Sequence, residues 1–149
     1  MRARFIKFVV PEPSQLSDVR AYLDAKQEER SPYRKGDALS PSAQAGKALY
    51  EGEADCVRCH PAPLFTDLKS YDVGTRHEVD KTGTFDTPTV LGMWSTAPYL
   101  HDGSAATLME MLTTYNAEDK HGVTSHLSQE QLQQLVDYML ELDYRDMVE

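Results

Sequence analysis

Two cysteines and a histidine stand together in the sequence Cys56-Val57-Arg58-Cys59-His60. Thiols separated by two residues can each add to a vinyl group of haem, and the histidine that follows can supply an imidazole to the iron. A structural zinc site would need two more cysteines or suitably spaced histidines, and a thioredoxin-like pair would need a βαβ turn. The chain has only these two cysteines. The spacing therefore predicts one covalently attached haem c, with His60 as its proximal ligand.

A buried haem needs apolar walls, and it also supplies apolar surface to a chain whose short helices and long loop make little core alone. The side chains expected to form this wall, or else to be ordinary core, are Tyr50, Leu64, Phe65, Leu91, Trp94, Tyr99 and Leu100.

Four segments have the apolar periodicity and start signals of amphipathic helices. The first covers residues 14–27 after a Ser14 cap, the second begins at Ser40-Pro41 and ends near Gly52, the third covers about 105–115, and the last follows a Ser128 cap. Residues 61–98 are rich in proline and glycine and have no helical period, which predicts a long ordered loop. The expected class is all-α, with short helices and long loops wrapped around one covalently bound haem.

Residues 18–24 are similar to residues 135–141 in the last predicted helix, and a turn-rich linker covers residues 30–36. This echo suggests that the chain opens with the terminal helix of a preceding, similar module. We therefore expect that helix and its linker in residues 1–37, and a cytochrome c domain in residues 38–149.

Composition and charge limit the possible binding partners of the protein and its cellular location. The 149 residues fit one compact domain, and a formal net charge of −9 disfavours nucleic acid as a partner. Acidic residues gather toward the carboxyl end, where they form either a solvated helix face or a docking surface for a basic redox protein. No apolar run is long enough to cross a membrane, and the stretch 5–10 is too short for a signal-peptide core. Because haem c is attached outside the cytoplasm, we expect a portion of a longer exported protein, periplasmic or extracellular.

Together with the haem motif, the segments Phe85–Leu91 and Trp94–Leu108 resemble the bacterial di-haem cytochrome c peroxidase superfamily. That superfamily includes the methylamine-utilisation di-haem oxidase and, more distantly, the rubber oxygenases. The resemblance covers about residues 38–143 and is to the second, carboxyl-terminal haem module. It implies a cytochrome c fold with a six-coordinate electron-transfer haem, while the reactive haem would lie in another chain or in a region outside this sequence.

The resemblance also suggests the sixth iron ligand. His121 is similar to the histidine that precedes the last helix in the rubber oxygenases, and Tyr115 has the spacing after His101 of the family position held by Met or Tyr. We favour His121 because imidazole is a strong haem ligand, keep Tyr115 as the main alternative, and place His126 or a methionine after them.

Three further positions match the family pattern. His101 resembles a turn histidine beside the haem edge, where it would be a hydrogen-bonded turn residue or assist proton transfer. Thr96 and Pro98 match positions whose backbone carbonyls help to hold a calcium ion between two modules.

Three functions remain open from the sequence. The first is a monohaem c-type module that transfers single electrons to a redox partner or a second haem module. The second is part of a di-haem peroxidase or oxidase that acts on hydrogen peroxide, and the third is a cytochrome subunit that assembles with its own copies into a longer electron path.

Overall fold

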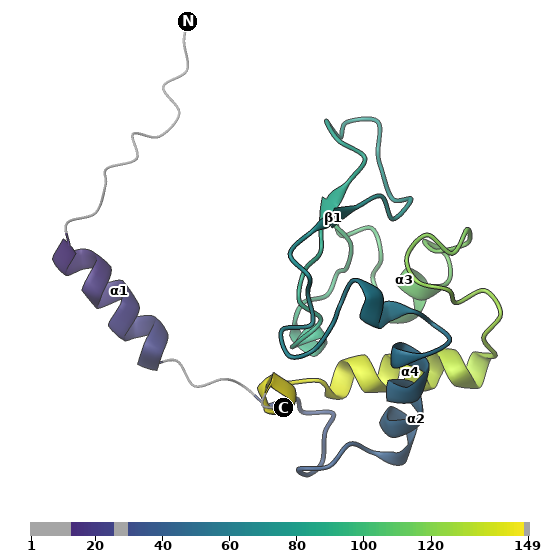
Figure 1. Ribbon diagram of the computed structural model, residues 1–149, viewed down its shortest axis with the longest axis horizontal. Helices are drawn as coiled ribbons and strands as arrows, with labels where there is room; N and C mark the ends of the chain where they lie inside the picture. Colours follow the sequence, from purple (N-terminus) through teal and green to yellow (C-terminus); the bar gives the residue numbers. More distant parts are fainter. Residues whose placement is uncertain (1–12, 26–29, 148–149) are drawn as a thin grey trace, which may run out of the picture.

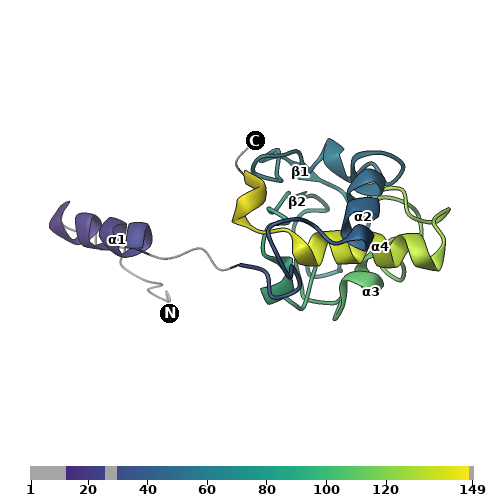
Figure 2. The same ribbon diagram turned by 90° about the horizontal axis from the view of Figure 1, so that it is seen from below.

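The computed structural model describes residues 13–25 and 30–147. Two long helices, α2 (Pro41–Glu51) and α4 (Gln129–Glu141), lie against each other at the centre of the folded part (Figures 1 and 2). Each begins as predicted. Ser40 caps α2, because its side chain accepts a hydrogen bond from the Ala43 N–H, and Pro41 is the first helical residue. At the start of α4, Ser128 forms a reciprocal capping box with Gln131.

Gly46 lies at the crossing of these two helices. A Cβ added there would lie 1.9 Å from the Gln134 carbonyl oxygen and 2.9 Å from the Tyr138 Cβ. Such distances are far inside van der Waals contact, so only glycine allows α2 to approach α4 this closely. Close helix packing is therefore the physical reason for a residue that weakens an isolated helix.

The core is built on the apolar face of α4, whose buried apolar residues are Leu132, Leu135, Val136, Tyr138 and Met139. Tyr50 from α2 is only 1% exposed and meets the Tyr138 ring edge-on, with 5.2 Å between the ring centroids. This edge-on arrangement is favourable for aromatic pairs. The helical periodicity read from the sequence thus faces the core as expected.

Residues 52–107 are mostly irregular and include the long loop predicted at 61–98. They contain the 3-10 turns η1 (Cys56–Arg58) and η2 (Met93–Ser95). The strands β1 (Ser70–Tyr71) and β2 (Phe85–Asp86) add a small antiparallel ribbon that the sequence did not predict. They are two residues long, too short for a visible alternation of polar and apolar residues.

The third helix, α3 (Leu108–Leu112), is shorter than the predicted 105–115. Ala105 pairs with Tyr99 in a β-bridge, and the Thr107 side chain caps the helix by accepting a hydrogen bond from the Glu110 N–H. The helix therefore begins three residues after the bridge. The predicted apolar face survives, because Leu108, Met111 and Leu112 are buried.

The helix α1 (Pro13–Ala25) stands apart from the other helices in both views (Figures 1 and 2). It begins at Pro13, so Ser14 lies inside it rather than capping it, and predicted helical residues 26 and 27 lie outside the described part of the chain. Its apolar side chains are more than half exposed: Leu16, Val19, Tyr22 and Leu23.

Acidic side chains near the carboxyl end bind an earlier segment of the same chain. Asp143 accepts a hydrogen bond from the Ser31 N–H, Asp146 pairs with Arg34, Glu141 accepts from the Ser40 N–H, and Asp137 accepts from the Ser42 hydroxyl. The expectation of a solvated or partner-docking face is wrong for these four carboxylates, because they anchor residues 31–42. Asp146 belongs to the 3-10 turn η3 (Tyr144–Met147), the last element of the described part of the chain.

None of the helices in the described ranges is long and apolar enough to cross a membrane.

Candidate haem site

The cysteine motif folds into one tight turn at η1. The N–H groups of Cys59 and His60 both donate to the Cys56 carbonyl, at 3.2 and 3.0 Å. The two cysteines are half-buried free thiols. Burial and then the nearby Asp55 carboxylate raise the pKa of Cys56 to about 12, so this side chain is a thiol rather than a thiolate at pH 7. The turn leaves both sulfurs available for covalent attachment.

His60 is oriented by backbone carbonyls. Its Nδ1 lies 3.0 Å from the Pro88 oxygen and 3.2 Å from the Phe65 oxygen. Carbonyl oxygens only accept, so Nδ1 carries the proton and the lone pair belongs to Nε2. Burial lowers the pKa of His60 below its usual value, which keeps the ring neutral at pH 7. His60 is thus a fixed imidazole with one nitrogen free to bind a metal.

His121 faces His60. The centroids of the two rings are 6.3 Å apart, and the ring planes are inclined by 38°. Two imidazole rings at this separation could hold one metal ion between them. Burial and then the neighbouring His60 lower the pKa of His121 to about 4, and burial lowers that of His60, so both rings are neutral at pH 7.

The loop that carries His121 is tied to the cysteine motif. The Val123 N–H donates to the Ala54 carbonyl at 2.9 Å. Gly122 has a φ of +79°, and a Cβ there would lie 2.9 Å from the same oxygen. Glycine is needed here because the backbone is left-handed and pressed against the residues that precede Cys56.

The predicted wall residues lie in two environments. Tyr50, Phe65 and Tyr99 are buried in the core, Leu91 and Leu100 pack against it, and Leu64 is 49% exposed. The Tyr50 and Tyr99 hydroxyls donate to the backbone carbonyls of His60 and Met93.

The Trp94 side chain has an unsatisfied hydrogen-bond donor. Its indole N–H is buried and has no hydrogen-bond acceptor within the part of the chain that the structure describes. A buried donor without a partner is costly, so this position suits a bound group that accepts a hydrogen bond. The two thiols and the neighbouring imidazoles of His60 and His121 fit a covalently bound haem.

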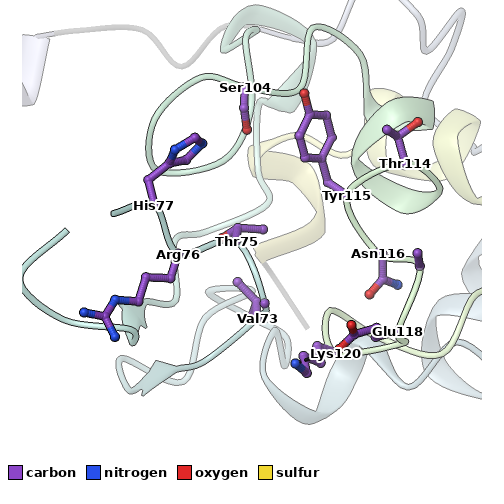
Figure 3. Close-up of a pocket in the computed structure, with 12 residues that line it drawn as sticks. Val73, Thr75, Arg76, His77, Ser104, Thr114, Tyr115, Asn116, Glu118 and Lys120 are labelled. Atoms are coloured by element: carbon purple, nitrogen blue, oxygen red, sulfur yellow. Dashed lines mark ion pairs between the residues drawn. The ribbon is translucent and has the colours of Figure 1, made fainter. Parts of the chain in front are cut away.

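Tyr115 lies in a separate pocket of about 270 Å³ between the loop at residues 73–77 and the loop after α3. Its side chain rises from that loop toward Ser104, with His77 across the pocket (Figure 3). Neither His60 nor His121 lines this pocket. The fold therefore brings His121 to His60 and directs the Tyr115 ring into a different cavity.

His101 holds two loops together. Its Nε2 lies 3.0 Å from Asp80 Oδ2, and its ring stacks on Phe85 with 3.7 Å between centroids. A second contact joins the same two loops, with His77 Nε2 3.3 Å from Asp102 Oδ2. His101 is thus a hydrogen-bonded turn residue, one of the two roles expected for it.

The remaining ligand alternatives lie elsewhere. The His126 side chain is about half exposed and lies 3.7 Å from Glu53, while Met93, Met109 and Met111 pack in or against the core. The positions proposed for calcium, Thr96 and Pro98, are exposed. Across residues 13–25 and 30–147, no three His, Cys, Asp or Glu side chains are grouped to hold a metal ion.

Sequence reasoning missed Asn116, the chain's single asparagine. It is 3% exposed and hydrogen-bonded to the backbone of His121. The signal in the sequence that could have identified it is that Asn116 is the one amide side chain in the loop between α3 and α4.

The fold and these residues define a cytochrome c-like domain. A family model described as RoxA-like, cytochrome c-like, matches residues 84–120. The hydrazine synthase structure from Kuenenia stuttgartiensis superposes with a TM-score of 0.75 at 28% identity, over 88% of this chain and 56% of that one. A MauG-like protein associated with microbial copper homeostasis has the same fold, with a TM-score of 0.58 at 21% identity.

Curated relatives agree with this class. The chain is 30% identical to hydrazine synthase subunit gamma of Kuenenia stuttgartiensis over 85% of its own length and 48% of the relative's. It is 28% identical to the cytochrome-c peroxidase IdrP1 of Denitromonas iodatirespirans, covering 54% of this chain and 32% of that protein. It is 34% identical to the methylamine utilization protein MauG of Methylophilus methylotrophus, covering 54% and 28%. The resemblance to the di-haem cytochrome c peroxidase superfamily is confirmed, and the chain spans about half or less of each relative's length.

Proposed function

We propose that this chain is a c-type cytochrome module for single-electron transfer through one haem, which Cys56 and Cys59 would hold covalently and which the imidazoles of His60 and His121 would bind. The observation that carries the proposal is the 6.3 Å separation of two facing imidazole rings beside the cysteine turn. The haem supplies a one-electron couple.

The protein's part would be to hold the imidazoles of His60 and His121 in place. Two carbonyls fix the His60 ring through Nδ1, and the loop hydrogen-bonded to Ala54 fixes the position of His121. Both imidazoles are neutral at pH 7. Little atomic movement then accompanies the change of charge, which favours rapid electron transfer.

The location and partner follow from the same chemistry. Covalent haem attachment places the protein in the periplasm or outside the cell. The named relatives are a synthase subunit, peroxidases and MauG, and the chain spans only part of each. The electron partner is therefore a second haem module or another redox protein.

The test is an absorption spectrum of the protein matured with haem, ferric and then dithionite-reduced, with and without carbon monoxide. We expect a six-coordinate spectrum that carbon monoxide does not change, and ready binding in His121→Ala. Tyr115→Phe and His126→Ala are the matched controls and should behave like the unmodified protein. Carbon monoxide binding to the unmodified protein, or an unchanged spectrum in His121→Ala, would overturn the axial assignment.

A peroxidase role is the second candidate, favoured by the relatives named cytochrome-c peroxidases. It requires an open iron site, here or in a second module, and His101 with its partner Asp80 would then be the groups able to move a proton. A change of the ferric spectrum on addition of hydrogen peroxide, with one haem per chain, would favour this role over simple electron transfer.

A further inference from the structure

Asn116 binds the backbone on both sides of the His121 side chain. Its Oδ1 accepts a hydrogen bond from the His121 N–H at 2.7 Å. Its Nδ2 donates to the His121 carbonyl at 3.1 Å and to the Gly122 carbonyl at 3.0 Å. One buried amide thus holds the peptide groups before and after the His121 Cα.

The orientation of this amide is itself determined. The Nδ2 group also donates to the Thr124 Oγ1 at 2.9 Å, and the Thr124 hydroxyl donates to the Leu112 carbonyl at 2.7 Å. Nδ2 therefore faces acceptors, while Oδ1 faces an N–H donor. A flipped amide would oppose like groups on both sides, so the contacts allow one orientation. Thr124 thus links Asn116, and through it the backbone of His121, to Leu112 at the end of α3.

We infer that Asn116 is a positioning residue that holds His121 at the distance needed to stay on the iron opposite His60. This inference rests on the proposed function, because it assumes that His121 is the distal ligand. The Val123 N–H on the Ala54 carbonyl ties the same loop to the cysteine turn. The backbone around His121 is thus held by two sets of hydrogen bonds, those of the Asn116 side chain and the one from Val123 to Ala54.

A second side chain closes the same loop without touching His121. The Asp119 carboxylate accepts hydrogen bonds from the N–H groups of Thr124 and Ser125 and from the Ser125 hydroxyl. Its removal weakens the loop but leaves every contact between Asn116 and His121 in place. Asp119→Ala is therefore the matched control that separates positioning of the ligand from general loop stability.

The test measures carbon monoxide binding to the reduced protein and the spin state of the ferric protein. Asn116→Asp keeps the size and the Oδ1 acceptor but turns a carboxylate oxygen toward two carbonyls. Asn116→Ala removes all the side-chain hydrogen bonds of this residue. We expect both variants to bind carbon monoxide at least about tenfold faster than the unmodified protein, because the buried peptide groups lose their partner. A high-spin ferric fraction should appear, and added imidazole should restore the low-spin spectrum.

Thr124→Val is the second variant, used where the Asn116 variants do not yield haem protein. It leaves the asparagine and removes the hydroxyl that orients it, and we expect about threefold faster binding. Rates in the Asn116 and Thr124 variants equal to those of Asp119→Ala would overturn the inference. If His121→Ala opens the iron site while these variants do not, only the positioning role fails. If His121→Ala changes nothing, the axial assignment itself has failed.

Discussion

At the scale of single residues, the chemistry of a side chain in the candidate site depends on its neighbours as well as on its residue type. His60 and His126 are both histidines, yet one is buried with its Nδ1 on two carbonyls and the other has a half-exposed side chain near Glu53. Burial lowers the pKa of both His60 and His121, so both rings are neutral at pH 7 and each has a nitrogen lone pair that could bind iron. Burial and the surrounding hydrogen bonds thus support the proposal that these two histidines are the ligands.

The first prediction concerns Gly122. Gly122→Ala places a Cβ 2.9 Å from the Ala54 oxygen on a backbone with a φ of +79°. We expect the free energy of unfolding to fall by about 1–2 kcal/mol and the His121 ligand to loosen. Urea unfolding and carbon monoxide binding check this, with Gly36→Ala as the control because a Cβ there meets nothing within 4 Å. Equal behaviour of the two variants would contradict a strained left-handed position.

The second prediction concerns Asp143 and acid. This side chain is nearly fully buried. Burial acts to raise the pKa of Asp143, but hydrogen bonds from Arg145 and from the Ser31 N–H outweigh it and lower the pKa to about 2. A carboxyl with a depressed folded pKa adds stability above its unfolded pKa, near 3.8, and loses it as pH falls toward 2.

The expected loss from this group is about 2 kcal/mol between pH 4 and pH 2. Asp143→Asn should be less stable than the unmodified protein at pH 7, with a difference that shrinks over this window. Urea unfolding at several pH values measures it. Asp86→Asn, at an exposed carboxylate on β2, is the control. A difference that stays constant down to pH 2 would show that Asp143 does not titrate as described.

At the scale of elements, the crossing of α2 and α4 sets the geometry of the site. The cysteine turn directly follows α2, and the loop that carries His121 leads into α4. The angle and closeness of these two helices therefore determine where the two imidazoles lie. Gly46 is the residue that allows the close approach.

The third prediction is that Gly46→Ala destabilises the protein by about 1–3 kcal/mol or more, because the added methyl group would overlap the Gln134 carbonyl. In an isolated helix the same change would be stabilising, so the sign identifies the tertiary contact. Thermal unfolding followed by circular dichroism measures it, with Gly36→Ala again as reference. A variant that melts at or above the unmodified temperature would refute the close crossing.

At the scale of the whole molecule, the folded part extends from residue 30 to the carboxyl-terminal turn. Ser31 and Arg34 connect to Asp143 and Asp146, whereas α1 exposes its apolar side chains. The exposed apolar face of α1 agrees with a helix whose partner is another module or another copy of the chain.

The fourth prediction compares two truncations. A chain that starts at Arg30 should keep its haem spectrum and melt within about 2 °C of the full chain. A chain that starts at Ser40 loses the hydrogen bond to Asp143 and the ion pair of Arg34, and should melt at least about 5 °C lower. Calorimetry of both forms decides this, and equal melting temperatures would show that residues 31–37 do not anchor the fold.

The sequence by itself determined the starts of α2 and α4 and most of the irregular segment between α2 and α3, and it predicted the haem attachment site. These features depend on residues a few positions apart, such as Cys56, Cys59 and His60, and local spacing records them directly. Only the tertiary structure separated His121 from Tyr115 and revealed Asn116 and the reason for Gly46. Those features depend on groups brought together from distant parts of the chain, and the packing of α2 against α4 determines which of them meet.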